Sequence, residues 1–181
     1  MITIQEIDQQ NVAHVNQCNG RFLVNAKLDL HVANGEINYT ILKASPYEKH
    51  YDYDDIDYTT YIGHPAKTAF LAYVDEQLAG QIILRKNWNN YAYIEHIAVD
   101  AKFRQQGLGR ALIARAIEWA KAKNLPGIML ETQNNNVAGC KLYESCGFKL
   151  GGFDRYLYRG LAPETDEIAL YWYLIFDRGE A

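Results

Sequence analysis

A glycine-containing segment in the second half of the chain has the residue types and spacing of an anion-binding loop. It reads Arg104-Gln-Gln-Gly107-Leu-Gly109 and stands directly before the clearest predicted helix. The first N–H groups of a helix lack intrahelical partners and carry a partial positive charge, so they bind anions. Gly107 and Gly109 let a ligand approach the backbone closely. With Lys102 and Arg110 close by, the segment predicts a pyrophosphate site.

Two other phosphate-binding motifs fit this segment less well. A P-loop carries Lys and then Ser or Thr after its glycines, whereas Arg110-Ala111 follows here. A dinucleotide fingerprint follows its strand directly and has a third glycine, but residues 100–106 intervene and the third position is Leu112. Glu131 does stand where that fingerprint has an acid. The glycines alone leave open an ordinary loop before a helix.

Glu95 is an acidic residue in the middle of an apolar segment that we expect to be a strand. Alternation predicts that Glu95 shares a face with Tyr93, Ile97 and Val99, and that His96 points to the other face. A carboxylate in such a strand is costly unless it is partnered or functional. Glu95 is therefore either a hydrogen-bonded structural group or a group that acts on a substrate.

A segment rich in Tyr and Asp, Ser45 to Pro65, carries further acidic residues and is predicted to be irregular. The acidic and aromatic residues are Glu48, Asp52, Asp54, Asp55, Asp57, Tyr51, Tyr53, Tyr58 and Tyr61. Negative potential concentrates cations, and aromatic faces bind them through cation–π contacts. The segment is either a recruiting surface for a cationic substrate or an ordinary solvated loop.

These residues must be positioned by a mixed α+β fold. Alternating or continuous apolar runs predict strands at 2–7, 36–43, 69–74, 81–88, 91–99 and 127–132, with two late strands within 148–158 and 167–174. Helical periodicity predicts helices at about 9–17, from 108 to before Pro126, and at about 137–146, the last ended by Gly147. Residues 20–34 show no clear pattern. At about 150 residues per domain, 181 residues predict one domain, 1–181.

Composition excludes several classes of function. The net charge of −4 argues against a nucleic-acid-binding surface. No apolar run approaches ~18 residues, so no membrane span is expected. The N-terminus lacks the pattern of a secretory signal, which predicts a cytoplasmic protein.

The cysteines Cys18, Cys140 and Cys146 cannot pair completely and are expected to be buried, reduced thiols. No zinc-like ligand cluster accompanies them, so we expect no metal.

Three segments in combination resemble the GNAT N-acetyltransferase superfamily over about residues 69–158. YIEHIAVD followed by RQQGLGRALI matches its acetyl-CoA signature, GIMLETQ resembles its fifth strand, and Asn136, Tyr143 and Gly147 match its pantetheine and thiolate motif. Gly139 stands where that motif usually has Ala. The resemblance implies a GNAT fold: a mostly antiparallel central sheet of six or seven strands flanked by about four helices.

The segments LPGIMLETQNNNVAGCKLYESCGF, GGFDRYLY and EIALYWYL and the Tyr- and Asp-rich residues 47–61 show a closer resemblance, over roughly 36–175. It is to the streptothricin acetyltransferases, which are antibiotic-resistance enzymes. It implies acetyl-CoA as co-substrate and a cationic amine, a β-lysine amine of streptothricin, as the acceptor. The amine attacks the thioester directly in a ternary complex. Family habit and the aromatic C-terminal strand (Tyr171, Trp172, Tyr173) are compatible with a homodimer.

The resemblance also implies which residues bind the cofactor. Backbone groups of Ile97, Ala98 and Val99 are expected to hold the pantetheine arm, and Asn136 its amides. The pyrophosphate is expected at Arg104, Gln105, Gln106, Gly107, Leu108, Gly109 and Arg110. Asn136 fits the alternative of a helix N-cap equally well.

Two residues are expected to be catalytic. Tyr143 occupies the family's position for the acid that protonates the departing thiolate, which suits a phenol of pKa near ~10 and a thiol near ~8.5. The acceptor amine, with a pKa near ~10.4, must first lose a proton. Glu95 is expected to take it, directly or through water, or to anchor the cation, with His96 ranked second as a base. The expected substrate-binding residues are Asp52, Asp54, Asp55 and Glu95.

Two alternatives remain open on the sequence. The first keeps the chemistry but changes the acceptor to a protein or peptide lysine or a polyamine, because an acidic loop suits any cationic amine. The second is a regulatory module that binds acyl-CoA without turnover. The presence of both Tyr143 and Glu95 favours an enzyme.

Overall fold

The computed structural model describes residues 1–51 and 55–177. Its contacts group the chain into two compact units. The first unit comprises Met1–Phe22, His50–Ile128 and the residues from Phe176, and the second comprises Leu23–Lys49 and Met129–Ile175. Seven strands form the predicted, mostly antiparallel sheet, in the order β1-β4-β5-β6 and then β7-β9-β8. The predicted α+β class and strand number are confirmed.

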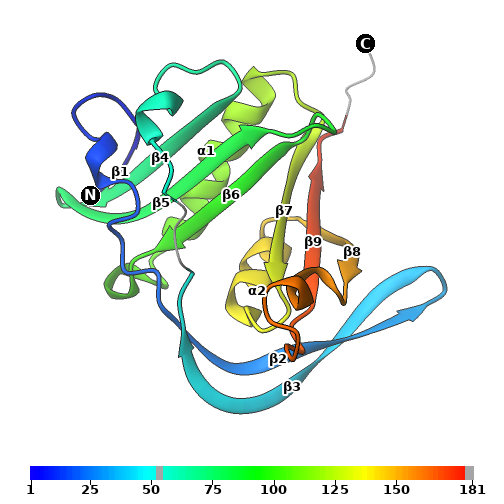
Figure 1. The fold of residues 1–181 in the computed structure, drawn as a ribbon. Helices are drawn as coiled ribbons and strands as arrows, with labels where there is room; N and C mark the ends of the chain where they lie inside the picture. The colour runs from blue at the N-terminus through cyan, green and yellow to red at the C-terminus, as the bar shows by residue number, and fades with distance from the viewer. Residues whose placement is uncertain (52–54, 178–181) are drawn as a thin grey trace. The chain divides into compact units, whose positions relative to one another are not determined.

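The first unit holds four antiparallel strands: β1 (Ile2–Glu6), β4 (Lys67–Val74), β5 (Gln77–Lys86) and β6 (Ala92–Val99) (Figure 1). Asp75 and Glu76 join β4 to β5, both with positive φ (46° and 65°), as the tightest hairpin turns require. The pairing of β5 with β6 shifts between Ile83 and Leu84, which lie opposite His96 and Ile94. Glu95 is therefore the extra residue of a β-bulge.

Helix α1 (Leu108–Ala122) packs on one face of these strands (Figure 1). Its buried residues include Leu108, Leu112 and Ala116, which follow the predicted four-residue spacing. Gly80 on β5 lets the helix approach, because a Cβ atom there would lie 2.9 Å from the Ala98 carbonyl oxygen and 3.2 Å from Leu112 Cδ1.

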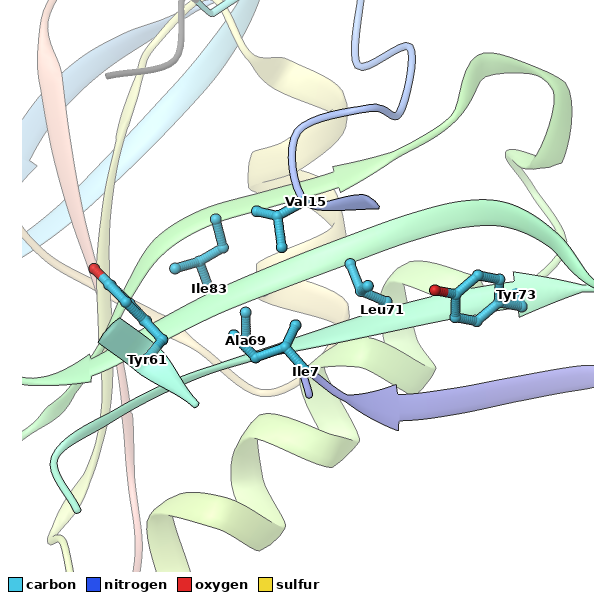
Figure 2. Close-up of a cluster of buried hydrophobic side chains, with 7 residues drawn as sticks. All are labelled: Ile7, Val15, Tyr61, Ala69, Leu71, Tyr73 and Ile83. Atoms are coloured by element: carbon cyan, nitrogen blue, oxygen red, sulfur yellow. The ribbon is translucent and has the colours of Figure 1, made fainter. Parts of the chain in front are cut away.

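The opposite face carries a cluster of buried side chains, drawn in Figure 2: Ile7, Val15, Tyr61, Ala69, Leu71, Tyr73 and Ile83. Two single-turn 3-10 helices cover it, η1 (Val12–His14) and η2 (Tyr58–Tyr61). The Tyr61 hydroxyl points away from the aliphatic side chains (Figure 2).

The helix expected at 9–17 is wrong, since only the turn η1 forms there. Asp8 Oδ1 accepts from the backbone N–H of Gln10 and of Asn11, and Asn11 Oδ1 accepts from the Asp8 N–H. These reciprocal bonds are those of a helix-capping box, and one helical bond follows them, from the Val12 N–H to the Asp8 carbonyl. After the turn, Val15 has an extended ψ of 135°.

The second unit contains a long hairpin and three sheet strands. The hairpin strands are β2 (Phe22–Ala33) and β3 (Glu36–Lys49), so β3 extends into a segment expected to be irregular. The remaining elements are β7 (Gly127–Gln133), α2 (Val137–Ser145), β8 (Lys149–Asp154), η4 (Leu157–Gly160) and β9 (Ala169–Ile175). Trp172 on β9 is buried in the core.

Both α-helices lie where periodicity predicted them, and the described residues add four 3-10 helices, including η3 (Ala101–Phe103). The estimate of about four flanking helices is too high, because the described residues form two α-helices and otherwise only single 3-10 turns. None of the helices in the described residues combines the length and apolar character needed to cross a membrane.

Candidate active site

The predicted pyrophosphate loop runs from η3 into the N-terminus of α1. Gln105 and Gly107 both have positive φ, 61° and 83°, and Gly107 is the N-cap residue. A Cβ atom on Gly107 would meet no atom within 4 Å, so the space beside this backbone is open. The first intrahelical bond is from Ala111 N–H to the Gly107 carbonyl. Open space next to N–H groups that lack helical partners suits a phosphate group.

Arg104 holds this loop in place. Its Nε donates to the Val99 carbonyl at 3.2 Å, and its guanidinium also donates to the Arg21 carbonyl. Asp100 caps η3 through the Lys102 N–H and also accepts from the Asn19 N–H at 2.9 Å. The loop is therefore fixed from both sides, and Arg104 is a structural anchor in addition to a source of positive charge.

Ile97, Ala98 and Val99 pair with Ile82, Gln81 and Gly80 of β5 along one strand edge. A pantetheine arm that extends the strand pattern would have to use the opposite edge. This placement is compatible with the role expected of these three residues.

Glu95 projects from the bulge into a set of donors. Its Oε1 accepts from Arg85 Nε at 2.8 Å and its Oε2 accepts from the Tyr61 hydroxyl at 2.8 Å. Arg85 also donates to Asn87 Oδ1 at 2.7 Å. Burial and the bond to Glu95 both raise the pKa of Tyr61, so the phenol stays protonated and serves as a donor. Glu95 is a partnered carboxylate whose orientation is fixed by two other side chains.

The expected alternation of Glu95 and His96 is wrong. Gln81 and Arg85 alternate along β5 on one face, and His96 bonds to Gln81 while Glu95 bonds to Arg85. The bulge places two consecutive side chains of β6 on that face. Ile97 and Val99, which pair with Ile82 and Gly80, therefore lie on the opposite face from Glu95.

A chain of hydrogen bonds fixes the proton on His96. The backbone N–H of Asn16 donates to Gln81 Oε1 at 2.7 Å, which makes Gln81 Nε2 the donor to Asn16 Oδ1 and to His96 Nδ1 at 3.0 Å. His96 therefore accepts at Nδ1 and carries its proton on Nε2. Burial lowers the pKa of His96 to about 4, which keeps the ring neutral near pH 7.

Asn136 is the N-cap of α2. Its Oδ1 accepts from the Gly139 N–H at 3.1 Å and its Nδ2 donates to Thr132 Oγ1 at 3.2 Å. A Cβ on residue 139 would lie 2.7 Å from Asn136 Nδ2. Gly139, the departure from the family motif, thus gives the Asn136 side chain room to fold back onto its own helix.

Tyr143 is buried on α2, and its ring packs against Phe148 and Trp172 with centroid distances of 6.0 and 6.4 Å. Gly147 ends the helix with φ 91°, and the Phe148 N–H bonds back to the Tyr143 carbonyl. The ring of the proposed acid is therefore held by two aromatic contacts.

The acidic segment is only partly described. Asp52 and Asp54 lie outside the described residues, and Asp55 is exposed. Asp57 caps η2 through the N–H and hydroxyl of Thr59, which lower its pKa. The Tyr61 ring, a suggested cation–π face, is covered by Lys67, whose Nζ lies 4.3 Å from the centroid.

The cysteines are free thiols, with Cys18 and Cys140 buried and Cys146 half-buried. Burial raises the pKa of both Cys18 and Cys140 to about 12, so neither forms a thiolate near neutral pH. Across residues 1–51 and 55–177, His, Cys, Asp and Glu form no cluster of three suited to a metal ion.

Sequence reasoning missed the partners of Glu95 and His96. Tyr61 comes from a segment interpreted as a recruiting loop, and Gln81 and Arg85 had no assigned role. One signal was available in the sequence: Gln81 is a polar residue in an otherwise apolar run, and the structure shows it fully buried on β5.

The chain is similar to known proteins in both sequence and fold. The acetyltransferase (GNAT) family matches residues 36–148. Streptothricin acetyltransferase A of Bacillus subtilis (strain 168) is 40% identical over 174 residues, which are 96% of this chain and 99% of the relative. A streptothricin acetyltransferase of Escherichia coli is 37% identical and covers 91% of each chain.

A solved structure shows the same fold at nearly full length. It is the crystal structure of a candidate streptothricin acetyltransferase from Bacillus anthracis in complex with acetyl coenzyme A, with a TM-score of 0.90, 47% identity and 98% coverage of both chains. The crystal structure of a nourseothricin acetyltransferase has a TM-score of 0.79 at 26% identity and covers 96% of this chain.

Proposed function

This chain belongs to the acetyltransferase (GNAT) family, and we propose that it acetylates an amine of the β-lysine moiety of streptothricin and so confers resistance to that antibiotic. It is an N-acetyltransferase that uses acetyl-CoA. The observation that supports the choice of substrate is the similarity to two streptothricin acetyltransferases over at least nine-tenths of both chains. That similarity extends well beyond the cofactor motif.

The cofactor supplies the thioester that the acceptor amine attacks. The loop at the α1 N-terminus binds its pyrophosphate, because open space adjoins the backbone at Gly107. We assign to Tyr143 the proton donation to the departing sulfur, which a phenol can make with little mismatch in pKa.

We assign to Glu95 the handling of the cationic amine. Arg85 and Tyr61 hold both carboxylate oxygens, so Glu95 is oriented before the substrate arrives. Glu95 then accepts the amine proton, directly or through water, or anchors the ammonium. His96 is the weaker candidate for a base, since its Nδ1 already accepts from Gln81 and its Nε2 carries the proton.

Acetylation removes a positive charge and hydrogen-bond donors from the drug, which explains how one group abolishes binding to its target. We propose that the enzyme acts in the cytoplasm and forms a homodimer. The acidic residues Asp52, Asp54 and Asp55 stay a proposed recruiting surface for the cation.

The test is a comparison of acceptors at saturating acetyl-CoA. Rates of acetyl transfer to streptothricin, lysine, spermidine and basic peptides are measured, and each product is identified by mass spectrometry. We expect kcat/KM for streptothricin to exceed that of every other amine by at least tenfold. A polyamine or peptide that matches streptothricin would shift the assignment to another acceptor, and acetyl-CoA binding without turnover on any amine would indicate a regulatory module.

A further inference from the structure

The second unit contains a half-buried group of charges that the proposed mechanism does not use. We define the Glu131 cluster as Glu131, Asn135, Glu167, Lys49 and Tyr158. Glu131 lies on β7, in a strand whose first four residues are all buried, and Tyr158 from η4 donates a hydrogen bond to its Oε1. Glu131 otherwise matches only the acidic position of a dinucleotide-binding motif that this chain lacks.

The cluster has more negative than positive charge. Lys49 Nζ lies 2.5 Å from Glu167 Oε1, and the side chains are only 16% and 24% exposed. Lys49 forms an ion pair with Glu167, and the hydrogen-bond donor to Glu131 is the neutral Tyr158 hydroxyl. Burial raises the pKa of Glu131 and the charge of Glu167 adds to this effect, whereas the Tyr158 hydrogen bond and the charge of Lys49 act in the opposite direction. One ammonium therefore serves two carboxylates in the Glu131 cluster.

Asn135 provides an independent sign that a donor group is missing. Its side chain is 7% exposed, and its Oδ1 has no hydrogen-bond partner in the described structure. Its Nδ2 donates to Glu167 Oε1 and to the Tyr47 hydroxyl, both at 2.9 Å. Because Nδ2 must face the Glu167 carboxylate, the amide cannot be reversed, and Oδ1 is held within the cluster as an acceptor.

A surplus carboxylate and a fixed, unpartnered acceptor together require a positively charged donor. An alkylammonium has one charge and three N–H groups, which match these needs. We propose that Glu131, Glu167 and Asn135 form a subsite for a non-reacting ammonium group of the polycationic substrate. This inference rests on the proposed function for the identity of the substrate. It places the non-reacting ammonium group at residues outside the acidic segment Ser45 to Pro65.

The test replaces Glu131 by Gln, which removes the charge and keeps an oxygen that accepts from Tyr158. We expect the KM for streptothricin to rise about tenfold, equivalent to about 1.4 kcal/mol, while the KM for acetyl-CoA and kcat stay near the wild-type values. Glu131→Asp keeps the charge and should recover part of the loss. Glu118→Gln is the matched control, because Glu118 is an exposed carboxylate on α1 and its loss changes the net charge equally.

The outcomes distinguish failure of the proposed subsite from failure of the proposed function. If the wild type acetylates streptothricin and Glu131→Gln keeps the wild-type KM, the subsite is wrong and the function stands. A rise of equal size in Glu118→Gln would also refute the subsite, because general charge would explain it. If the wild type does not acetylate streptothricin, the function fails, and calorimetric binding of spermidine decides: weaker binding by Glu131→Gln supports the subsite, and equal binding refutes it.

Discussion

The buried His96 is expected to lower the free energy of unfolding as the pH falls below neutrality. Burial lowers its pKa in the folded protein from 6.5 to about 4, whereas the unfolded chain keeps a pKa of about 6.5. Between these values the unfolded state binds more protons, so the free energy of unfolding decreases as the pH decreases. The contribution is fully present above pH 6.5 and is lost as the pH falls toward 4.

The size of this effect follows from the two pKa values. At about 1.36 kcal/mol for each pKa unit, a displacement from 6.5 to about 4 amounts to about 3.4 kcal/mol when protonation is complete. At pH 5 the free energy of unfolding is already lower by about 2 kcal/mol than at neutral pH. That is a large part of the stability of an ordinary domain.

The assay is urea unfolding at pH 7 and pH 5 for the wild type and for His96→Asn. Asn places an amide oxygen near the position of Nδ1, so it can keep the hydrogen bond from Gln81 without titrating. The wild type should lose about 2 kcal/mol more than His96→Asn between the two pH values. His31→Asn, which alters an exposed histidine on β2, should behave as the wild type. Equal losses in the wild type and His96→Asn would refute the argument that burial keeps this ring neutral.

Three further predictions concern the cofactor loop, the packing of α1 and the proposed acid. Gly107→Val should raise the KM for acetyl-CoA about tenfold, because φ is +83° and a side chain would fill the open space; an unchanged KM would remove the loop from the pyrophosphate site. Gly80→Ala should lower the free energy of unfolding in urea by about 1–3 kcal/mol, because its Cβ would lie 2.9 Å from the Ala98 carbonyl oxygen; wild-type stability would contradict this packing. Tyr143→Phe should lower kcat by about 10²–10⁴-fold and keep the melting temperature within a few degrees, because the ring contacts remain; full kcat would exclude Tyr143 as the acid.

Elements with strong local patterns were predicted well from the sequence. The strands β4, β5 and β6 and the helix α1 have apolar periodicities that persist over many residues, so tertiary contacts only reinforce them. The helix expected at 9–17 does not continue past its capped first turn, because Val15 is extended and the Asn16 N–H donates to Gln81 Oε1 on β5. The hairpin of β2 and β3 was missed although Asn34-Gly35 is a strong turn signal and both residues have positive φ.

The site was less predictable, because it depends on contacts between distant segments. The spacing of Gly107 and Gly109 identified the loop, since that geometry is local. The bulge at Glu95 could not be read from β6 alone, because it arises from a register shift against β5. Tyr61 and Arg85 reach Glu95 from η2 and β5, and no pattern in the sequence links them.

The most direct test of the proposed function is the release of free CoA thiol from acetyl-CoA in the presence of micromolar streptothricin. We predict a kcat/KM above about 10⁴ M⁻¹s⁻¹ for the drug, within the usual range of enzymes acting on their own substrates. Acetyl-CoA that binds but releases no thiol with streptothricin, while another amine is acetylated at such a rate, would contradict the proposed function and leave the fold and the cofactor in place.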